Sequence, residues 1–269
     1  MSIWLPMLAS FHAFITWQLP RIACYWLISL MWLPGIVKAD VVQPSMVIII
    51  DDLGYNLANG LGIINLPGPI TLAVMPHTPF GEALARRGAA LDKEIMLHAP
   101  MQNHSDKKLG PGGLTANMSE GHFKSILREA VASVPFAEGI NNHMGSALTE
   151  KPVPMKWTMD VANELGLFFV DSRTSAKSIA WQQAKKSNTP SLRRDVFLDN
   201  EVTDEALERQ FQQAMQVALK HEYAVLIGHP YPETIDFLER SLSKLDEAGI
   251  KLVSASALIW QLQPHLNAL

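Results

Sequence analysis

Short runs of apolar residues recur through the chain, and helix-like stretches separate them. The run Ile48-Ile49-Ile50 is β-branched throughout and lacks the alternating polar residues of a half-exposed strand. Unbroken runs of this kind are typical of strands in a parallel sheet that helices cover on the outside. The pattern predicts strands at 46–52, 69–75, 94–99, 138–144, 167–171, 196–199, 223–228 and 250–253.

Amphipathic stretches fill the intervals between these strands. The clearest is 203–222, where Thr203 can cap the first turn and apolar residues from Leu207 to Ala218 form one stripe. Ser119 is expected to cap another helix. Helices are predicted at 57–65, 80–91, 119–134, 154–165, 178–186, 203–222 and 232–248, with a short one after 256.

About eight strand–helix steps with short connections therefore follow one another, without a linker or a repeat. This order predicts a single α/β domain over residues 40–269, with its parallel strands in a closed or nearly closed barrel. An open, Rossmann-like sheet is the alternative.

Residues 1–39 differ in composition from the rest of the chain. Arg21 is the one charged residue among the first 37, and an apolar run occupies 22–33. The run ends shortly before Ala39, a small residue suited to a cleavage site before Asp40. These features predict a secretory signal peptide and a periplasmic protein. An uncleaved anchor is the alternative, although the run is shorter than the roughly 20 residues of a spanning helix.

Charge and cysteine usage exclude some functions. The whole chain has 22 basic and 26 acidic residues, and the predicted signal holds two of the basic ones, so residues 40–269 carry a formal charge of −6. Nucleic acid, which binds basic surfaces, is not an expected partner. Cys24 is the only cysteine and lies in the predicted signal. The domain therefore has no disulfide, thiolate nucleophile or cysteine ligand for zinc.

Polar residues collect where the predicted strands end, which is where parallel α/β folds place their sites. The first strand ends in Asp51-Asp52, the third reaches His98, and the seventh is followed by His229. The fourth ends in Asn141-Asn142-His143 and the fifth in Asp171-Ser172-Arg173.

Aspartate and histidine together favour a divalent metal, with zinc as the expected ion. Neighbouring strand side chains point in opposite directions, so Asp51 and Asp52 cannot play the same role. One could bind the ion while the other transfers protons, with the sharp turn at Leu53-Gly54 setting them apart. A metal-activated water would then be the nucleophile, and His229 could protonate the leaving group.

Each of these residues also has a structural interpretation. Asp51-Asp52 could begin a turn or cap a helix. His98 and His143 could be hydrogen-bonded histidines of the core, and Asp171 could cap a helix or accept a buried hydrogen bond. The pair Arg193-Arg194 is interpreted as a solvated surface, with a substrate-contact patch as the alternative.

Six segments in order carry a family resemblance: 48–54 (IIIDDLG), 97–101 (LHAPM), 109–112 (LGPG), 139–146 (GINNHMGS), 169–172 (FVDS) and 227–230 (IGHP). The first resembles the opening motif of polysaccharide deacetylases, an apolar strand that ends in Asp-Asp-Gly. The whole set resembles the divergent, exported branch of that family in bacteria. The resemblance implies a deformed (β/α) barrel of seven or eight parallel strands.

The resemblance also implies residue roles. Asp51 corresponds to the catalytic base, Asp52 to a metal ligand and His229 to the catalytic acid. A backbone N–H near Gly145 is expected to stabilise the oxyanion. Further contacts to the substrate are expected from Asn142, Asp171 and Arg173.

The sequence departs from the family pattern at the remaining metal ligands. The family uses two histidines four residues apart, but Gln102 stands four residues after His98, and His104 is six residues away. We therefore expect His143, on the neighbouring strand, to be the third ligand. The family's Arg-x-Pro motif is also absent.

These roles imply a metal-dependent hydrolase that removes an acyl group, normally acetyl, from an envelope polysaccharide or peptidoglycan sugar. A non-catalytic carbohydrate-binding or envelope-scaffold protein on the same fold is the alternative. A different hydrolase, such as a metal phosphatase or an amidase, is the third hypothesis, because a fold alone does not fix the reaction. A membrane is an expected partner only through an uncleaved N-terminal segment.

Overall fold

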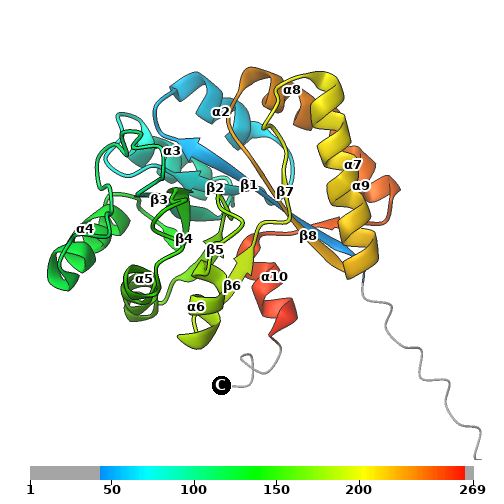
Figure 1. Cartoon of the computed structure of the whole chain (residues 1–269). Helices are drawn as coiled ribbons and strands as arrows, with labels where there is room; N and C mark the ends of the chain where they lie inside the picture. The colour runs from blue at the N-terminus through cyan, green and yellow to red at the C-terminus, as the bar shows by residue number, and fades with distance from the viewer. Residues whose placement is uncertain (1–42, 264–269) are drawn as a thin grey trace, which may run out of the picture. The chain divides into compact units, whose positions relative to one another are not determined.

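The computed structural model describes residues 43–263, which form one curved parallel sheet with helices around it (Figure 1). The signal peptide or anchor predicted at 1–39 lies outside the described residues. Within residues 43–263, no helix is long and apolar enough to cross a membrane. The strands are β1 (Ser45–Leu53), β2 (Thr71–Val74), β3 (Ile95–Met101), β4 (Ala137–Met144), β5 (Phe168–Asp171), β6 (Ser191–Arg193), β7 (Val196–Phe197), β8 (Tyr223–Gly228) and β9 (Lys251–Leu252).

The strands lie in the order β6-β5-β4-β3-β2-β1-β8-β7, and β9 pairs with the start of β1. Every pairing is parallel. From β1 to β6, strands that follow each other in the chain are neighbours in the sheet, which is the order of a barrel rather than that of an open doubly wound sheet. The sheet curls into a half-barrel, so the expected deformed (β/α) barrel is confirmed.

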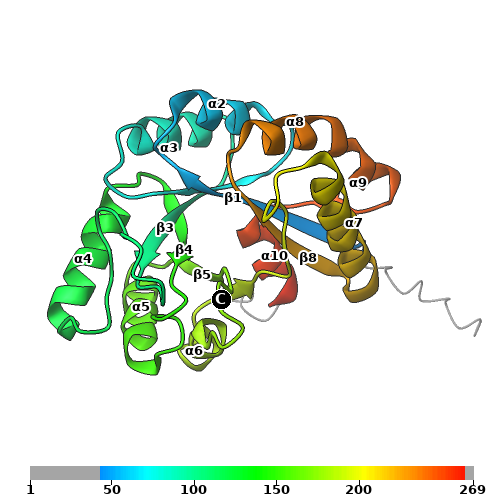
Figure 2. The ribbon, with the colours of Figure 1, turned by 45° about the horizontal axis from the view of Figure 1, so that its top comes forward.

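Helices cover the outer side of the curved sheet, whereas the last helix packs inside it at one end (Figure 2). They are α2 (Leu57–Asn65), α3 (Gly81–Ala89), α4 (Glu120–Ala132), α5 (Pro152–Glu164), α6 (Ala180–Lys186), α7 (Asp204–His221), α8 (Pro232–Ser241), α9 (Ser243–Glu247) and α10 (Ala255–Leu262).

Strand side chains alternate between two apolar clusters. In β1, Met46, Ile48 and Ile50 face outward to the helices, whereas Val47 and Ile49 face inward. The inward cluster also contains residues of β2, β3, β5, β6 and β8, and α10 completes it. The amino ends of the strands are therefore filled with apolar side chains, and the carboxyl ends are left for the site.

One stretch of chain joins the two edges of the sheet. Ser191–Arg193 pairs with β5, and Val196–Phe197 pairs with β8. The N–H of Arg194 donates to a carbonyl on the β5 side, and the N–H of Asp195 donates to a carbonyl on the β8 side. The backbone thus changes partner between these two residues and brings the edges together.

The elements differ from the predicted ones in three places. Ser191–Arg193 forms a strand too short to leave a periodic pattern. The helix predicted at 232–248 is interrupted at Leu242 and becomes α8 and α9. Ser119 occupies the N-cap position of α4, but its side chain makes no capping hydrogen bond, whereas the Thr203 side chain does cap α7.

Candidate metal centre

The inward row of β1 ends in a carboxylate. Val47 and Ile49 point into the inner cluster, and strand alternation places Asp51 next in the same row. Asp51 is only 2% exposed. Its Oδ1 accepts a hydrogen bond of 2.7 Å from Nδ2 of Asn141, on β4. The Asp51 carboxylate therefore lies inside the barrel, directly above the apolar cluster.

Asp52 would point outward if β1 continued regularly, but a turn redirects it. Its backbone φ is 58°, in the left-handed region that aspartate tolerates better than most residues. Gly54 follows with a φ of 131°, and a Cβ there would lie 2.1 Å from Oγ1 of Thr78. This tight turn therefore requires glycine, and it brings the Asp52 carboxylate to the barrel mouth.

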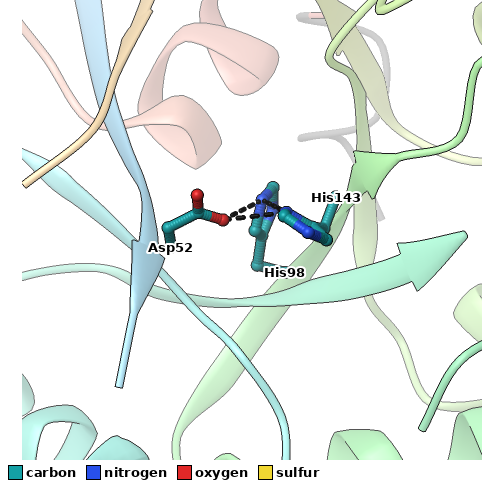
Figure 3. Close-up of side chains that lie close together, drawn as sticks. All are labelled: Asp52, His98 and His143. Atoms are coloured by element: carbon teal, nitrogen blue, oxygen red, sulfur yellow. Dashed lines mark hydrogen bonds and ion pairs between the residues drawn. The ribbon is translucent and has the colours of Figure 1, made fainter. Parts of the chain in front are cut away.

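Two histidines from adjacent strands meet Asp52 there (Figure 3). His98 lies on β3 and His143 on β4, in rows that face inward. Oδ1 of Asp52 is 2.8 Å from Nδ1 of His143 and 3.2 Å from Nε2 of His98. The two ring nitrogens are themselves 3.2 Å apart. Three donor atoms thus form a compact triangle on one side of the mouth.

The Asn141 amide fixes which nitrogen of His98 faces this triangle. Its Nδ2 donates to Asp51, so its Oδ1 is free to accept from Nδ1 of His98, 2.7 Å away. His98 then carries its proton on Nδ1 and presents the lone pair of Nε2. Outer hydrogen bonds of this kind set the tautomer of histidines that bind metals.

The triangle fits a divalent ion. Among the described residues, Oδ1 of Asp52 is buried and has no hydrogen-bond partner, although two imidazole nitrogens lie close to it. A buried carboxylate oxygen of this kind favours a cation as its partner. Donor atoms bound to one tetrahedral zinc ion at about 2.0–2.1 Å would lie roughly 3.3 Å from one another, near the 2.8 and 3.2 Å found here. Asp52, His98 and His143 are the predicted ligand set, and the structure brings these three together.

Electrostatics separates the two adjacent aspartates. Burial raises the pKa of Asp51 above its usual range, although the charges of His98 and His229 oppose the shift. Burial acts in the same direction on Asp52, but His143 and His98 outweigh it and hold the pKa of Asp52 below its usual range. Asp51 is therefore the better proton acceptor, and Asp52 remains a carboxylate.

His229 follows directly after β8, the neighbour of β1 on the side away from β2. Its Nδ1 is 2.8 Å from Oδ1 of Asp199. Its backbone N–H and the hydroxyl of Thr234 donate to the other oxygen, at 2.6 and 2.9 Å. Burial lowers the pKa of His229, but the hydrogen bond and charge of Asp199, with the charge of Asp51, raise it to about 9. His229 is thus protonated at neutral pH.

Asp199 is a site residue that the sequence analysis did not single out. Its side chain is fully buried, and both carboxylate oxygens are directed at His229 or its surroundings. It closes the predicted strand at 196–199, so the strand-end rule that marked Asp51 and His98 would also have marked it. The shortness of that strand obscured the signal.

Two predicted substrate-binding residues do not reach the site. Asn142 and Asp171 occupy outward positions at the ends of β4 and β5, and both are buried. Oδ1 of Asn142 accepts from the N–H of Ser172 at 3.0 Å, and the Asp171 carboxylate accepts from Arg173 N–H and Ser178 hydroxyl, each at 2.8 Å. Strand alternation is the physical reason for their placement. The half-buried Arg173 follows them at the rim, with a φ of 47°.

The structure also places Gly145, Gln102 and the pair Arg193-Arg194. An oxyanion donor is expected among the backbone N–H groups near Gly145; the N–H of Gly145 itself donates to the carbonyl of Met101 at 3.0 Å and is not available for this role. Gln102, at the position of the family's second histidine, accepts from the N–H of Ala116 in the following loop. The solvated-surface interpretation holds for Arg193, which is exposed, but is wrong for the half-buried Arg194.

The fold and this site together define a (β/α) barrel protein with a candidate divalent-metal centre at the carboxyl ends of its strands. Residues 48–259 match the model of a family described as divergent polysaccharide deacetylase. The match covers most of the chain, and the chain belongs to this family.

The chain is also similar to three proteins whose functions are not described. An uncharacterized protein of Haemophilus influenzae is 40% identical over 213 residues, covering 78% of this chain and 75% of its own length. The uncharacterized protein YibQ of Escherichia coli is 32% identical over 223 residues, covering 83% and 70%. The crystal structure of an uncharacterized protein of Agrobacterium tumefaciens aligns with a TM-score of 0.77 at 23% identity, over 80% of this chain and 89% of its own. That similarity shows the fold.

Proposed function

We propose that this protein is a metal-dependent hydrolase that removes an acetyl group from a sugar of an envelope polysaccharide or peptidoglycan. One observation carries the proposal. The Asp52–His98–His143 triangle lies at the same end of the barrel as a buried carboxylate, Asp51, and a protonated imidazole, His229, on which the charges of Asp51 and Asp52 act. Membership of the deacetylase family supports an acetylated saccharide as the substrate.

Asp52, His98 and His143 would hold the ion, which in this proposal is zinc. When bound at such a set of two imidazoles and one carboxylate, a divalent ion polarises a carbonyl oxygen and makes water acidic enough to react near neutral pH.

Asp51 and His229 account for the proton transfers. Asp51 accepts a proton from water as the water oxygen bonds to the acetyl carbon, and its raised pKa suits a general base. His229 donates its proton to the leaving nitrogen or oxygen as the bond to the acetyl carbon breaks. The products are acetate and a free amine or hydroxyl, so atoms and protons balance.

Two neighbouring residues position these groups. The Asn141 side chain bonds to both Asp51 and His98 and so sets the base relative to a ligand. Asp199 holds the His229 ring through Nδ1 and leaves Nε2 free to face the substrate. Both arrangements keep the reacting groups fixed before substrate binds.

We place the activity in the periplasm, on the composition of residues 1–39. Acetylated envelope glycans would be accessible there.

The decisive experiment measures acetate release from a panel of acetylated oligosaccharides after loading with zinc. We expect release by the wild type and none by Asp51→Ala. No release from any member of the panel, with zinc bound, would overturn the proposal.

A non-catalytic carbohydrate-binding protein is the second candidate. Gln102 at the position of the family's second histidine ligand favours it, because the usual spacing of ligands is lost. Equal glycan binding by the wild type and Asp51→Ala, with turnover by neither, would select this function. The same assay therefore separates the two candidates.

A further inference from the structure

A half-buried arginine lies where the chain crosses between the sheet edges. Nε of Arg194 donates to the carbonyl of Ser172 at 2.6 Å, and Nη2 donates to the carbonyl of Arg173 at 2.9 Å. Both acceptors belong to the turn that follows β5, at the carboxyl end of the barrel. The guanidinium is therefore held at the same end of the barrel as the metal centre.

The guanidinium and the imidazole of the proposed catalytic acid both pack against the Phe197 ring. Its central carbon is 3.6 Å from the centroid of the Phe197 ring. That ring in turn stacks on the imidazole of His229, with centroids 6.2 Å apart and planes 22° apart. Phe197 is partly buried and packs against the inward-facing cluster, so Arg194 and His229 share one wall of the barrel mouth.

This cation has no carboxylate bound to it. Within residues 43–263, neither Arg194 nor Arg173 forms an ion pair. Burial and the nearby charge of Arg173 lower the pKa of Arg194 to about 10, although the charges of Asp171, Asp195 and Asp51 oppose the shift, and Arg194 stays charged at neutral pH. A half-buried charge without a direct ion-pair partner is costly. The charge of Arg173 acts on Arg194, so the two cations together favour an anion at this place.

The turn after β5 carries Arg173, accepts the hydrogen bonds of Arg194 and has a further polar group without a partner. Arg173 has a φ of 47°, and its N–H is fixed by the Asp171 carboxylate. The hydroxyl of Ser172 is buried and has no hydrogen-bond partner among the described residues. Two of the five N–H groups of Arg194 bond to carbonyls, and its Nη1 group remains for a ligand.

We propose that Arg173 and Arg194 form a subsite for a carboxylate on the substrate, so that the protein selects acidic N-acetyl sugars over neutral ones. The inference rests on the proposed carbohydrate function and names its substrate class. A guanidinium fork matches a carboxylate in geometry and charge. It would also offset the repulsion between an acidic sugar and the carboxylates of Asp51 and Asp52.

The test compares two forms of one ligand. Glycan strands in which alternate N-acetyl sugars carry a lactyl carboxylate are titrated into the zinc-loaded full chain, and then their methyl esters are titrated. Asp51→Asn serves as the background, so that the strands stay intact. We expect the acid to bind about tenfold or more tightly than the ester, with a preference that weakens as salt is raised.

Three variants locate the preference. Arg194→Gln and Arg173→Gln should each reduce the preference for the acid, whereas Arg194→Lys, which keeps the charge but loses the fork, should retain part of it. Arg193→Gln is the matched control. This neighbour is exposed over the Trp181 ring, 4.5 Å from its centroid, and its loss should leave the preference intact.

Equal binding of acid and ester by the Asp51→Asn chain, with both arginines present, would overturn the inference. Binding of neither ligand by this chain would overturn it as well. A preference that survives the Arg173→Gln, Arg194→Gln double variant overturns it as well. Acetate release by the wild type is measured separately. Acetate release without a preference for the acid would therefore reject the subsite alone, whereas absence of acetate release would reject the proposed function.

Discussion

The two halves of the barrel interior are built from the same strand rows but have opposite chemistry. Toward the amino ends, Val47, Ile49 and Val225 are fully buried against one another and α10. Two residues further along β1, the same inward row carries Asp51. The row of β8 changes in the same way, from Ile227 to His229.

The contrast shows how the apolar half controls the charged half. Side chains below the site exclude water from one side of Asp51, and this desolvation is the largest cause of its raised pKa. The closely packed rows also fix the position along the strands at which each ionisable side chain lies. We expect substitutions in the apolar half to change stability and those in the charged half to change chemistry.

Removal of a metal ligand should have the largest effect. Asp52→Ala, His98→Ala and His143→Ala each take one donor from the triangle, so we expect loss of bound zinc and of acetate release. Elemental mass spectrometry after dialysis measures the ion. His104→Ala is the control, because His104 is exposed and lies beside Glu150 instead. Zinc retained in His143→Ala would mean that another residue is the third ligand.

Asp51→Asn should separate chemistry from metal binding. The amide keeps the shape of the side chain and can still accept the hydrogen bond from Asn141. It cannot accept a proton, so kcat should fall by about 10²–10⁴-fold with zinc content unchanged. Steady-state acetate release measures the loss. A kcat within a few fold of the wild type would remove Asp51 from the role of base.

Ile49→Ala tests the other half of the comparison, two residues away in the same row. Ile49 is fully buried, so the cavity should lower the free energy of unfolding by about 2–5 kcal/mol. Zinc content should stay near the wild-type level. Denaturant titration measures the stability, with Val153→Ala, at an exposed position, as the control. Loss of zinc with no loss of stability would break the division between the halves.

Most of the fold could be predicted because it depends on long, regular patterns. The unbroken run 48–50 and the stripe of 203–222 each specify an element without help from the rest of the chain. Ser191–Arg193 could not be predicted, since a three-residue strand owes its existence to pairing with β5. The break at Leu242 is likewise invisible in an amphipathic pattern that runs on through it.

Two sequence features, the ends of the predicted strands and the alternation of strand side chains, predict part of the site. They placed Asp51, His98 and His143 near one another, and the turn at Gly54 explains why Asp52 joins them. The role of Arg194 could not be predicted in the same way. Its position depends on the backbone, which changes its pairing from β5 to β8 between Arg194 and Asp195. The sequence pattern does not indicate this change.

Asp199→Asn should give the smallest effect on activity, and it tests the role of His229 in the charged half. Burial lowers the pKa of His229, but Asp199, helped by the charges of Asp51 and Asp52, raises it from its ordinary value of about 6.5 to about 9. Activity that needs protonated His229 is therefore present below pH 9 and is lost as the pH rises through that value. Asparagine removes the charge but can still accept from Nδ1, so the basic limb of kcat/KM should move toward neutral pH.

The variant should match the wild type near pH 6 and fall about tenfold behind it near pH 8 to 9. The pair should also stabilise the fold fully below the unfolded pKa of His229, and that contribution should fade as the pH rises through 9. Asp204→Asn, an exposed aspartate paired with Arg240, is the control and should leave both profiles unchanged. An unmoved basic limb in Asp199→Asn would show that His229 is not the proton donor, and the charged half would then need a different acid.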